Sequence, residues 1–205
     1  VARDANGSLS FSITVPVVAE GTHNVLISVA TASVTKTFTT DMNMTIAPES
    51  GNTGTEVTIT ASGFAPSSNA DIYFGATKVK TATTTAEGGL NTTITIPAAA
   101  EGTHTIRVEV AGISASKDFT ISAQASFNPT SGNVRDTVTI SGTGFGASKP
   151  LTVTWNGSPM QGSTGLVTTA EGSFNITFAV PVVKGGSYTV SISDGTITKT
   201  QTFTV

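Results

Sequence analysis

The chain has 205 residues, a formal net charge of −3 and a pI of about 5.3, and only 11% of its residues are charged. Without a basic stretch it has little electrostatic attraction for nucleic-acid phosphates, and without cysteine it can form neither disulfides nor thiolate metal sites. It contains no run of apolar residues long enough to span a bilayer. Threonine supplies 39 residues, which favours strands and gives a surface that is polar without being charged.

The first predicted strand covers residues 9–15. Its apolar residues alternate with serine and threonine, and this period of two predicts a strand with one buried face. The apolar members are Leu9, Phe11, Ile13 and Val15. The same pattern recurs at residues 90–96 and 174–180, so the strand belongs to a repeated unit.

Two lines of sequence define that unit. The first, "PESGNTGTEVTITASGF" at residues 48–64, returns as "PTSGNVRDTVTISGTGF" at residues 129–145. The second, "AEGGLNTTITIPAAAEGTHTIRVEV" at residues 86–110, returns at residues 170–192 and also occurs at residues 5–29. The second line therefore has three copies, whereas the first has only two.

These copies divide the chain into one half unit and two complete units. We expect residues 1–42 to be the second half of a unit, and residues 43–122 and 123–205 to be complete. Each complete unit contains six or seven short runs of period two separated by Gly, Pro and Asn turns, and no stretch shows a helical period. The predicted fold is therefore all-β, with tandem immunoglobulin-like β-sandwiches.

The repeated motifs also resemble a known family. Each complete unit reads P-x-S-G-x-x-x-x-x-V-T-I-x-x-x-G-F, then an apolar strand such as "DIYFGATKV" or "LTVTWNGSPM", then A-E-G, and the last unit closes on G-x-Y-x-V. This order is similar to the immunoglobulin-like repeats of the IPT/TIG type in microbial cell-surface proteins. The resemblance implies an immunoglobulin-like fold and an extracellular location, whereas such sandwiches serve many unrelated functions.

One ring position is shared by all three copies. His23 and His104 occupy it in the first two copies, and Tyr188 occupies it in the third. A metal pair or a general base is one interpretation of two histidines. A position that accepts either ring at the corner before a late strand resembles instead the tyrosine corner, in which the ring binds an upstream backbone group. We therefore expect all three residues to be structural.

The sequence offers no arrangement typical of catalysis. No serine lies in G-x-S-x-G, and "GTGFG" at residues 142–146 lies between two predicted strands rather than before a helix. The acidic residues are scattered, without the D-x-D-x-D run of calcium loops. A calcium site between units, built from Asp41, Glu49 or Asp118, is the remaining alternative. We expect a protein that is not an enzyme and has no cofactor.

Asparagines supply candidate modification sites. Five of them begin an N-x-S/T sequon, the acceptor pattern of N-glycosylation. They are Asn6, Asn43, Asn91, Asn156 and Asn175. Asn91 and Asn175 are the same outward position of the same predicted strand in the two complete units, so these two are the favoured sites.

The half unit shapes the functional prediction. A sandwich without its first strands exposes an apolar face, so either further strands precede Val1 in a longer array or another subunit supplies them by strand addition. Both interpretations predict an extended extracellular assembly at the cell surface, such as a surface layer, filament or stalk. Its partners would be neighbouring repeats or copies of the same protein, together with glycans.

The alternative function is an adhesin arm or a carbohydrate-binding accessory module. Carbohydrate sites present exposed aromatic side chains, whereas the sole tryptophan, Trp155, aligns with Phe74 of the other complete unit and is expected in the core. We therefore place the structural function first.

Overall fold

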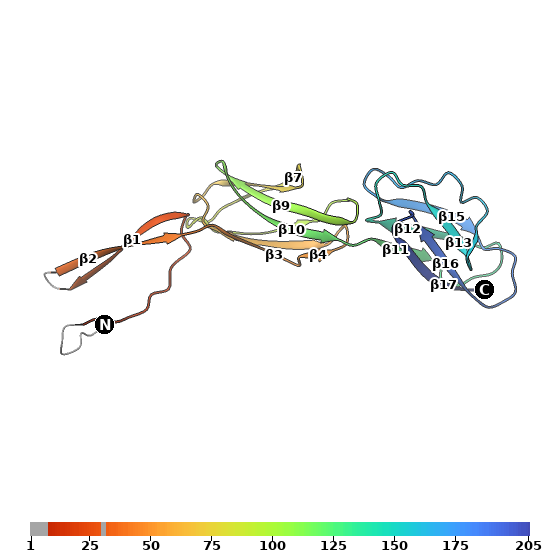
Figure 1. Ribbon diagram of the computed structural model, residues 1–205, viewed down its shortest axis with the longest axis horizontal. Helices are drawn as coiled ribbons and strands as arrows, with labels where there is room; N and C mark the ends of the chain where they lie inside the picture. The colour runs from red at the N-terminus through yellow and green to blue at the C-terminus, as the bar shows by residue number, and fades with distance from the viewer. Residues whose placement is uncertain (1–7, 30–31) are drawn as a thin grey trace.

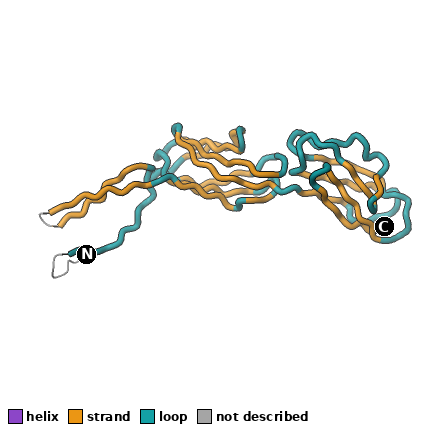
Figure 2. Tube along the Cα trace, in the orientation of Figure 1, coloured by secondary structure: helices purple, strands orange, loops and turns teal. Residues whose placement is uncertain are grey.

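The computed structural model describes residues 8–29 and 32–205. Three parts lie in a row, with the described residues before 43 at one end of the molecule and the C-terminus at the other (Figure 1 and Figure 2). The described residues form seventeen strands and no helix, which confirms the all-β prediction. Within those ranges there is accordingly no helix that could cross a membrane.

The middle unit, residues 43–122, is a two-sheet sandwich. One sheet has the order β3-β5-β8 and the other the order β4-β10-β9-β6-β7. The neighbouring strands are antiparallel, except that β4 runs parallel to β10. The strands are β3 (Asn43–Ala47), β4 (Ser50–Gly51), β5 (Glu56–Ser62), β6 (Asn69–Phe74), β7 (Thr77–Thr83), β8 (Leu90–Thr95), β9 (Gly102–Val110) and β10 (Ile113–Ile121).

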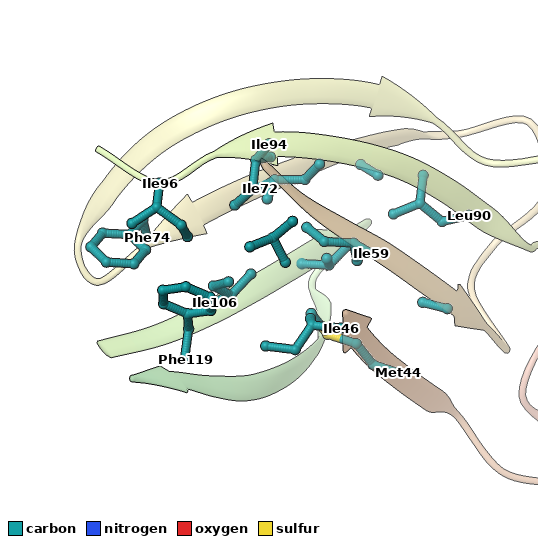
Figure 3. Close-up of a cluster of buried hydrophobic side chains, with 14 of the residues drawn as sticks. Met44, Ile46, Ile59, Ile72, Phe74, Leu90, Ile94, Ile96, Ile106 and Phe119 are labelled. Carbon is teal, nitrogen blue, oxygen red and sulfur yellow. The ribbon is translucent and has the colours of Figure 1, made fainter. Parts of the chain in front are cut away.

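The core of the middle unit lies between these sheets, as Figure 3 shows. Along β5 and β9, apolar residues are buried and alternate with polar residues that reach the surface. This is the period of two that the sequence shows, because successive side chains of a strand point to opposite faces. The labelled core residues are Met44, Ile46, Ile59, Ile72, Phe74, Leu90, Ile94, Ile96, Ile106 and Phe119. Each fully buried aliphatic or aromatic side chain among them contributes about 1.5–3 kcal/mol.

The C-terminal unit, residues 123–205, repeats this architecture. Its sheets have the orders β11-β12-β15 and β14-β13-β16-β17. The strands are β11 (Gln124–Asn128), β12 (Thr137–Thr143), β13 (Thr152–Trp155), β14 (Ser158–Pro159), β15 (Phe174–Ala179), β16 (Ser187–Ser193) and β17 (Thr198–Thr204). Trp155 is 6% exposed, as is Phe74 of the middle unit, which confirms that Trp155 belongs to the core.

Glycines of the repeated motifs permit close backbone contacts. The backbone N–H of Phe64 donates to the carbonyl oxygen of Gly88 at 3.1 Å, and Phe145 bonds Gly172 in the same way at 2.9 Å. A Cβ at Gly88 would lie 2.0 Å from the Phe64 oxygen, and one at Gly172 would lie 1.9 Å from the Phe145 oxygen. The G-F and A-E-G motifs therefore contact each other at the end of two neighbouring strands of one sheet, and only glycine fits there.

The half unit departs from its prediction. The strands β1 (Gly21–Val29) and β2 (Ala32–Thr40) pair as the two arms of a hairpin, but residues 9–15 form no strand. The prediction of a strand at residues 9–15 is therefore wrong for this structure. The equivalent strands β8 and β15 are held by β5 and β12, whereas the described residues contain no such partner for residues 9–15. Without a partner, the backbone groups of that segment have no ladder to join.

Candidate functional surfaces

The three corner rings make the same contact. His23 Nε2 lies 2.9 Å from the carbonyl oxygen of Ala19, and His104 Nε2 lies 2.8 Å from that of Ala100. The Tyr188 hydroxyl donates to the carbonyl oxygen of Lys184 at 2.8 Å. In every copy the ring binds the residue four positions upstream, so the histidine nitrogens that make these contacts hold the backbone in place.

Two of these rings also extend the core. His104 stacks on Phe74 with ring centroids 5.0 Å apart, and Tyr188 stacks on Trp155 at 5.2 Å. Each pair therefore joins a buried aromatic ring to a ring that fixes a backbone corner.

The boundaries between units share a second repeated contact, called here the joint. The backbone N–H of Glu20 donates to the carbonyl oxygen of Gly63 at 2.7 Å, and that of Glu101 donates to Gly144 at 2.8 Å. Both glycines have positive φ, +95° and +76°. A Cβ at Gly63 would lie 2.8 Å from Met42 Cα, so the linking segment passes directly over the glycine. Successive units are therefore docked on each other in the same way twice.

Side chains strengthen the joint between the middle and C-terminal units. The Glu101 carboxylate accepts a hydrogen bond from the backbone N–H of Ala123 at 3.2 Å. The Asn52 amide donates to the Gln124 side-chain oxygen at 2.8 Å. These contacts span the boundary without a flexible linker, which favours a semi-rigid arrangement over freely moving units.

Four of the five sequon asparagines lie in the described part of the chain, and Asn6 lies outside it. Asn91 and Asn175 are exposed at equivalent places on β8 and β15. Asn43 is exposed at the start of β3, and Asn156 is exposed in the turn after β13. All four side chains are therefore accessible to a modifying enzyme.

The candidate calcium residues remain separate. Among the described residues, no three His, Cys, Asp or Glu side chains come together as metal ligands would. Asp41, Glu49 and Asp118 are exposed, and Asp118 accepts a hydrogen bond from the Thr105 hydroxyl at 3.0 Å.

The half unit exposes apolar side chains. Phe11 is 42% exposed and Phe38 is 44% exposed, whereas Phe119 and Phe203, the counterparts of Phe38, are buried. A cavity of about 330 Å³ lies between residues 13–18 and the hairpin, lined in part by Ile13, Val25 and Phe38. In the complete units the sheets β3-β5-β8 and β11-β12-β15 cover the corresponding face.

Two threonines just before the A-E-G turn hold the loop that follows the G-F motif, and the sequence prediction missed them. The buried Thr84 hydroxyl donates to the carbonyl oxygen of Ala65 at 2.7 Å and accepts from the backbone N–H of Ser68 at 2.9 Å. Thr168 makes the equivalent bonds to Gly146 and Lys149. The signal in the sequence is the repeated T-T-A-E-G at residues 84–88 and 168–172.

A buried carboxylate occurs in the C-terminal unit. Burial alone would raise the pKa of Asp194, but hydrogen bonds from the backbone N–H groups of Ile197, Gly146 and Thr196 outweigh burial and lower the pKa. This carboxylate therefore links the turn between β16 and β17 to the loop that contains Gly146.

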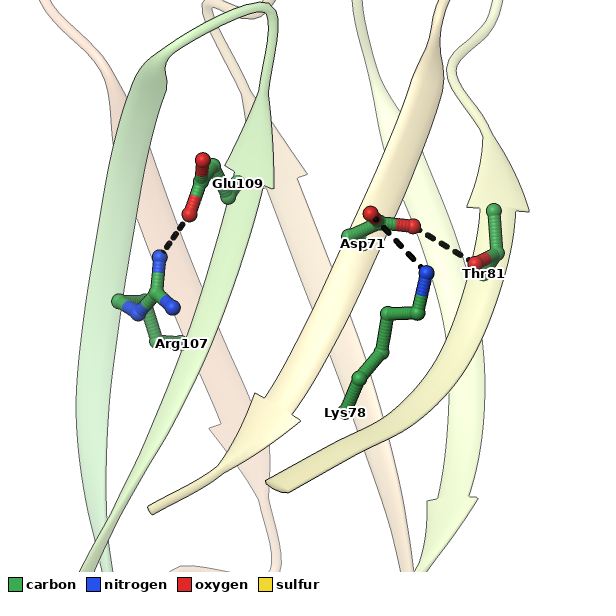
Figure 4. A network of polar contacts seen from close by, with 5 residues as sticks. All are labelled: Asp71, Lys78, Thr81, Arg107 and Glu109. Carbon is green, nitrogen blue, oxygen red and sulfur yellow. Dashed lines mark hydrogen bonds and ion pairs between the residues drawn. The ribbon is translucent and has the colours of Figure 1, made fainter. Parts of the chain in front are cut away.

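The outward face of the sheet β10-β9-β6-β7 carries charged groups, shown in Figure 4. Asp71 accepts hydrogen bonds from the Thr81 hydroxyl at 2.6 Å and from Lys78 at 3.3 Å. The Thr81 bond is the largest influence on the Asp71 pKa and lowers it, and Lys78 adds to this effect. Arg107 pairs with Glu109, and this hydrogen bond raises the pKa of the guanidinium.

The strand order, the paired motifs and the absence of helix from the described residues define an immunoglobulin-like sandwich protein. The IPT/TIG domain model matches residues 43–122 and 125–205, so the chain belongs to the IPT/TIG domain family. The resemblance inferred from the repeated motifs is thereby confirmed. No curated protein sequence matches the chain significantly.

Several solved structures are similar in fold. The Yersinia pseudotuberculosis adhesin InvE is 12% identical with a TM-score of 0.38, and the match covers 80% of this chain and 58% of that chain. Invasin, a bacterial integrin-binding protein, is 16% identical with a TM-score of 0.36, over 80% of this chain and 39% of that chain. The Bacteroides ovatus protein SGBP-B, solved with a mixed-linkage heptasaccharide, is 16% identical with a TM-score of 0.36, over 92% of this chain and 55% of that chain.

Proposed function

We propose that this chain is a non-catalytic structural part of an extracellular cell-surface protein. Its stacked immunoglobulin-like units form a semi-rigid segment of a stalk, filament or surface layer. The observation that carries the proposal is the repeated joint, in which Glu20 meets Gly63 and Glu101 meets Gly144 through the same backbone bond. An array that docks each unit on the next in one way extends by repetition.

The composition of the sheet surfaces supports an extracellular location. Most outward positions of β12 and β15 are threonine, serine and asparagine, which hold water without adding charge. Asn91 and Asn175 are exposed on such surfaces, and we propose them as the main glycosylation sites. Mass spectrometry of glycopeptides from the native protein tests this, and unmodified asparagines at both positions would contradict it.

The main experiment is protease treatment of intact source cells, followed by electron microscopy of material sheared from their surface. We expect an antibody raised against residues 43–205 to label intact cells, and protease to remove that label. The labelled material should be rods, filaments or lattice patches. Label that is found only after cell lysis would contradict the proposal, and label on isolated rods that bind glycans would favour the adhesin alternative.

A further inference from the structure

The two complete units differ on one outward sheet face. In the C-terminal unit, Thr154 of β13 lies opposite Ser191 of β16, and Thr152 lies opposite Ser193. The hydroxyls of Thr154 and Ser191 are 2.6 Å apart and form a hydrogen bond. On the neighbouring strand β17 the outward residues are again threonines. This face of the C-terminal unit therefore presents hydroxyl groups.

The middle unit places charged and aromatic side chains at the same positions. Tyr73 of β6 lies opposite Arg107 of β9, and Asp71 lies opposite Glu109. On the edge strand β7, Lys78 lies opposite Tyr73. The register is the same in both units, so Tyr73 and Arg107 correspond to Thr154 and Ser191. Because the C-terminal unit forms the same sheet with hydroxyl residues, the fold does not require these charges.

Stability of the middle unit does not account for the charges either. The side chains of Lys78 and Asp71 are 51% and 35% exposed, and those of Arg107 and Glu109 are 34% and 40% exposed. Ion pairs with this exposure contribute little to folding. A chain with only 11% charged residues nevertheless gathers four of them here.

The aromatic member of the cluster is typical of a protein contact. The Arg107 guanidinium carbon lies 4.1 Å from the centroid of the Tyr73 ring, so the long arginine side chain is held against a rigid platform. Arginine and tyrosine are among the residues that supply most binding energy in protein interfaces. A guanidinium that is already ordered loses less conformational entropy when it binds a carboxylate.

The charges form two rows across the strands. Asp71 and Glu109 make an acidic row, and Lys78 and Arg107, with Tyr73 between them, make a basic row. The rows are two residues apart along each strand, or about 6.8 Å. A two-fold axis that runs across the strands between these rows places the acidic row of one copy over the basic row of the other. The face is therefore complementary in charge to itself.

We propose that this face, formed by Asp71, Tyr73, Lys78, Arg107 and Glu109, is a lateral contact between two copies of this chain that lie antiparallel. The contact goes beyond the proposed function, which concerns the stacking of units along one chain. Side-by-side contacts of this kind would join single arrays into pairs. In the dimer, Glu109 of each copy faces Arg107 of the other, and Asp71 lies between the partner's two cations.

The test is sedimentation equilibrium of the full chain at low ionic strength and in about 1 M salt, where the Debye length falls to about 3 Å. We expect a dimer at low ionic strength and a dissociation constant at least tenfold higher in high salt. A chain that is monomeric under both conditions overturns the proposal. A dimer that salt does not weaken also overturns it, because association through the apolar half unit would behave in that way.

Two charge variants test the pairing of rows. In K78E/R107E the face is acidic, and in D71K/E109K it is basic, so each variant should repel its own copies. We expect each alone to dimerise at least tenfold more weakly than the original chain, and an equimolar mixture to associate about as tightly as that chain. A mixture that remains monomeric, or a single variant that dimerises normally, overturns the proposal.

The C-terminal unit supplies matched controls. T154A/S191A alters the corresponding hydroxyl face and should leave dimerisation unchanged. Y73T/R107S introduces the residues that the C-terminal unit carries at those positions, so it should fold normally while dimerisation weakens. Equal dimerisation by Y73T/R107S and the original chain would overturn the assignment of Arg107 and Tyr73 to the contact.

Discussion

The backbone N–H of Glu101 donates a hydrogen bond to the carbonyl oxygen of Gly144 at 2.8 Å, across the boundary between the middle and C-terminal units. Gly144 has a φ of +76°, and a Cβ there would lie 3.0 Å from Ala123 Cα. Glycine at this position thus permits both the left-handed backbone of the loop and the close approach of the linking segment.

Gly144→Ala should loosen this boundary. Alanine in left-handed backbone costs about 1–2 kcal/mol. Its Cβ would also press on Ala123 and displace the segment that links the two units. Gly157→Ala is the control, because Gly157 has a φ of +84° and a Cβ at that position would meet no atom within 4 Å. Distances between spin labels on the two units should broaden only in Gly144→Ala. Equal spin-label distance distributions in both variants would show that Gly144 does not hold the two units in their relative orientation.

Asp194→Asn should destabilise the C-terminal unit. The carboxylate accepts from Gly146, Thr196 and Ile197, and an amide nitrogen cannot accept in its place. A hydrogen bond to a charged group contributes about 1.5–3 kcal/mol, so we expect a loss of that size in urea unfolding at neutral pH. Asp71→Asn, on a carboxylate whose side chain is 35% exposed, is the control and should have a smaller effect.

The same carboxylate should make the C-terminal unit sensitive to acid. Its folded-state pKa is lowered, so its contribution is fully present above the unfolded-state value of about 3.9 and is lost as the pH falls through the folded-state value. Unfolding midpoints of the original chain and Asp194→Asn should therefore converge as the pH is lowered. A constant difference between them at all pH values would be inconsistent with this assignment.

Tyr188→Phe should remove one corner bond and little else. The hydroxyl donates to the Lys184 carbonyl oxygen, while the ring remains free to stack on Trp155. The expected cost is about 0.5–1.5 kcal/mol, measured from the urea midpoint with tryptophan fluorescence, since Trp155 reports on this unit alone. His104→Tyr, which places the third copy's residue in the second copy, should retain most of the stability of the middle unit, measured by circular dichroism because that unit has no tryptophan. An unchanged urea midpoint in Tyr188→Phe would show that the hydrogen bond from Tyr188 to Lys184 does not stabilise the unit.

Hydrogen exchange should distinguish the half unit from its counterparts. Residues 9–15 lie in no strand, so their amides should exchange rapidly, whereas the equivalent amides of β8 and β15 should be protected. The Glu20 amide should be slower than those before it, because it bonds the Gly63 carbonyl oxygen. Protection of residues 9–15 comparable to that of β8 would show that they pair in solution.

Alternation in the sequence predicted the fold because each complete unit contains both members of every strand pair. Ile59 and Ile106 could be assigned to the core from period and repeat alone. Residues 9–15 show that alternation is not sufficient, since an amphipathic strand also needs a neighbouring backbone. The prediction used the pattern of side chains and could not supply that neighbour.

The surfaces were less accessible to prediction for a different reason. Arg107 and Glu109 are visible in the sequence as departures from the serines of the third copy. Only the register of β6 on β9 shows that they face Tyr73 and Asp71. The joint likewise depends on a hydrogen bond between backbone groups of Glu20 and Gly63. Apart from the glycine, the residue types at these positions do not indicate such a bond.

The short strand β4 has a mechanical consequence. It lies parallel to β10, where the backbone N–H of Thr120 donates to the Glu49 carbonyl oxygen at 3.0 Å and that of Ser122 donates to the Gly51 carbonyl oxygen at 2.8 Å. The chain enters the middle unit through β3, which pairs with β5, continues into β4, and leaves the unit from β10. Tension along the molecule therefore pulls β4 and β10 past each other in shear, and their hydrogen bonds must break together rather than one after another. The two bonds at the P-x-S-G motif thus resist extension in shear, together with the pairing of β3 on β5.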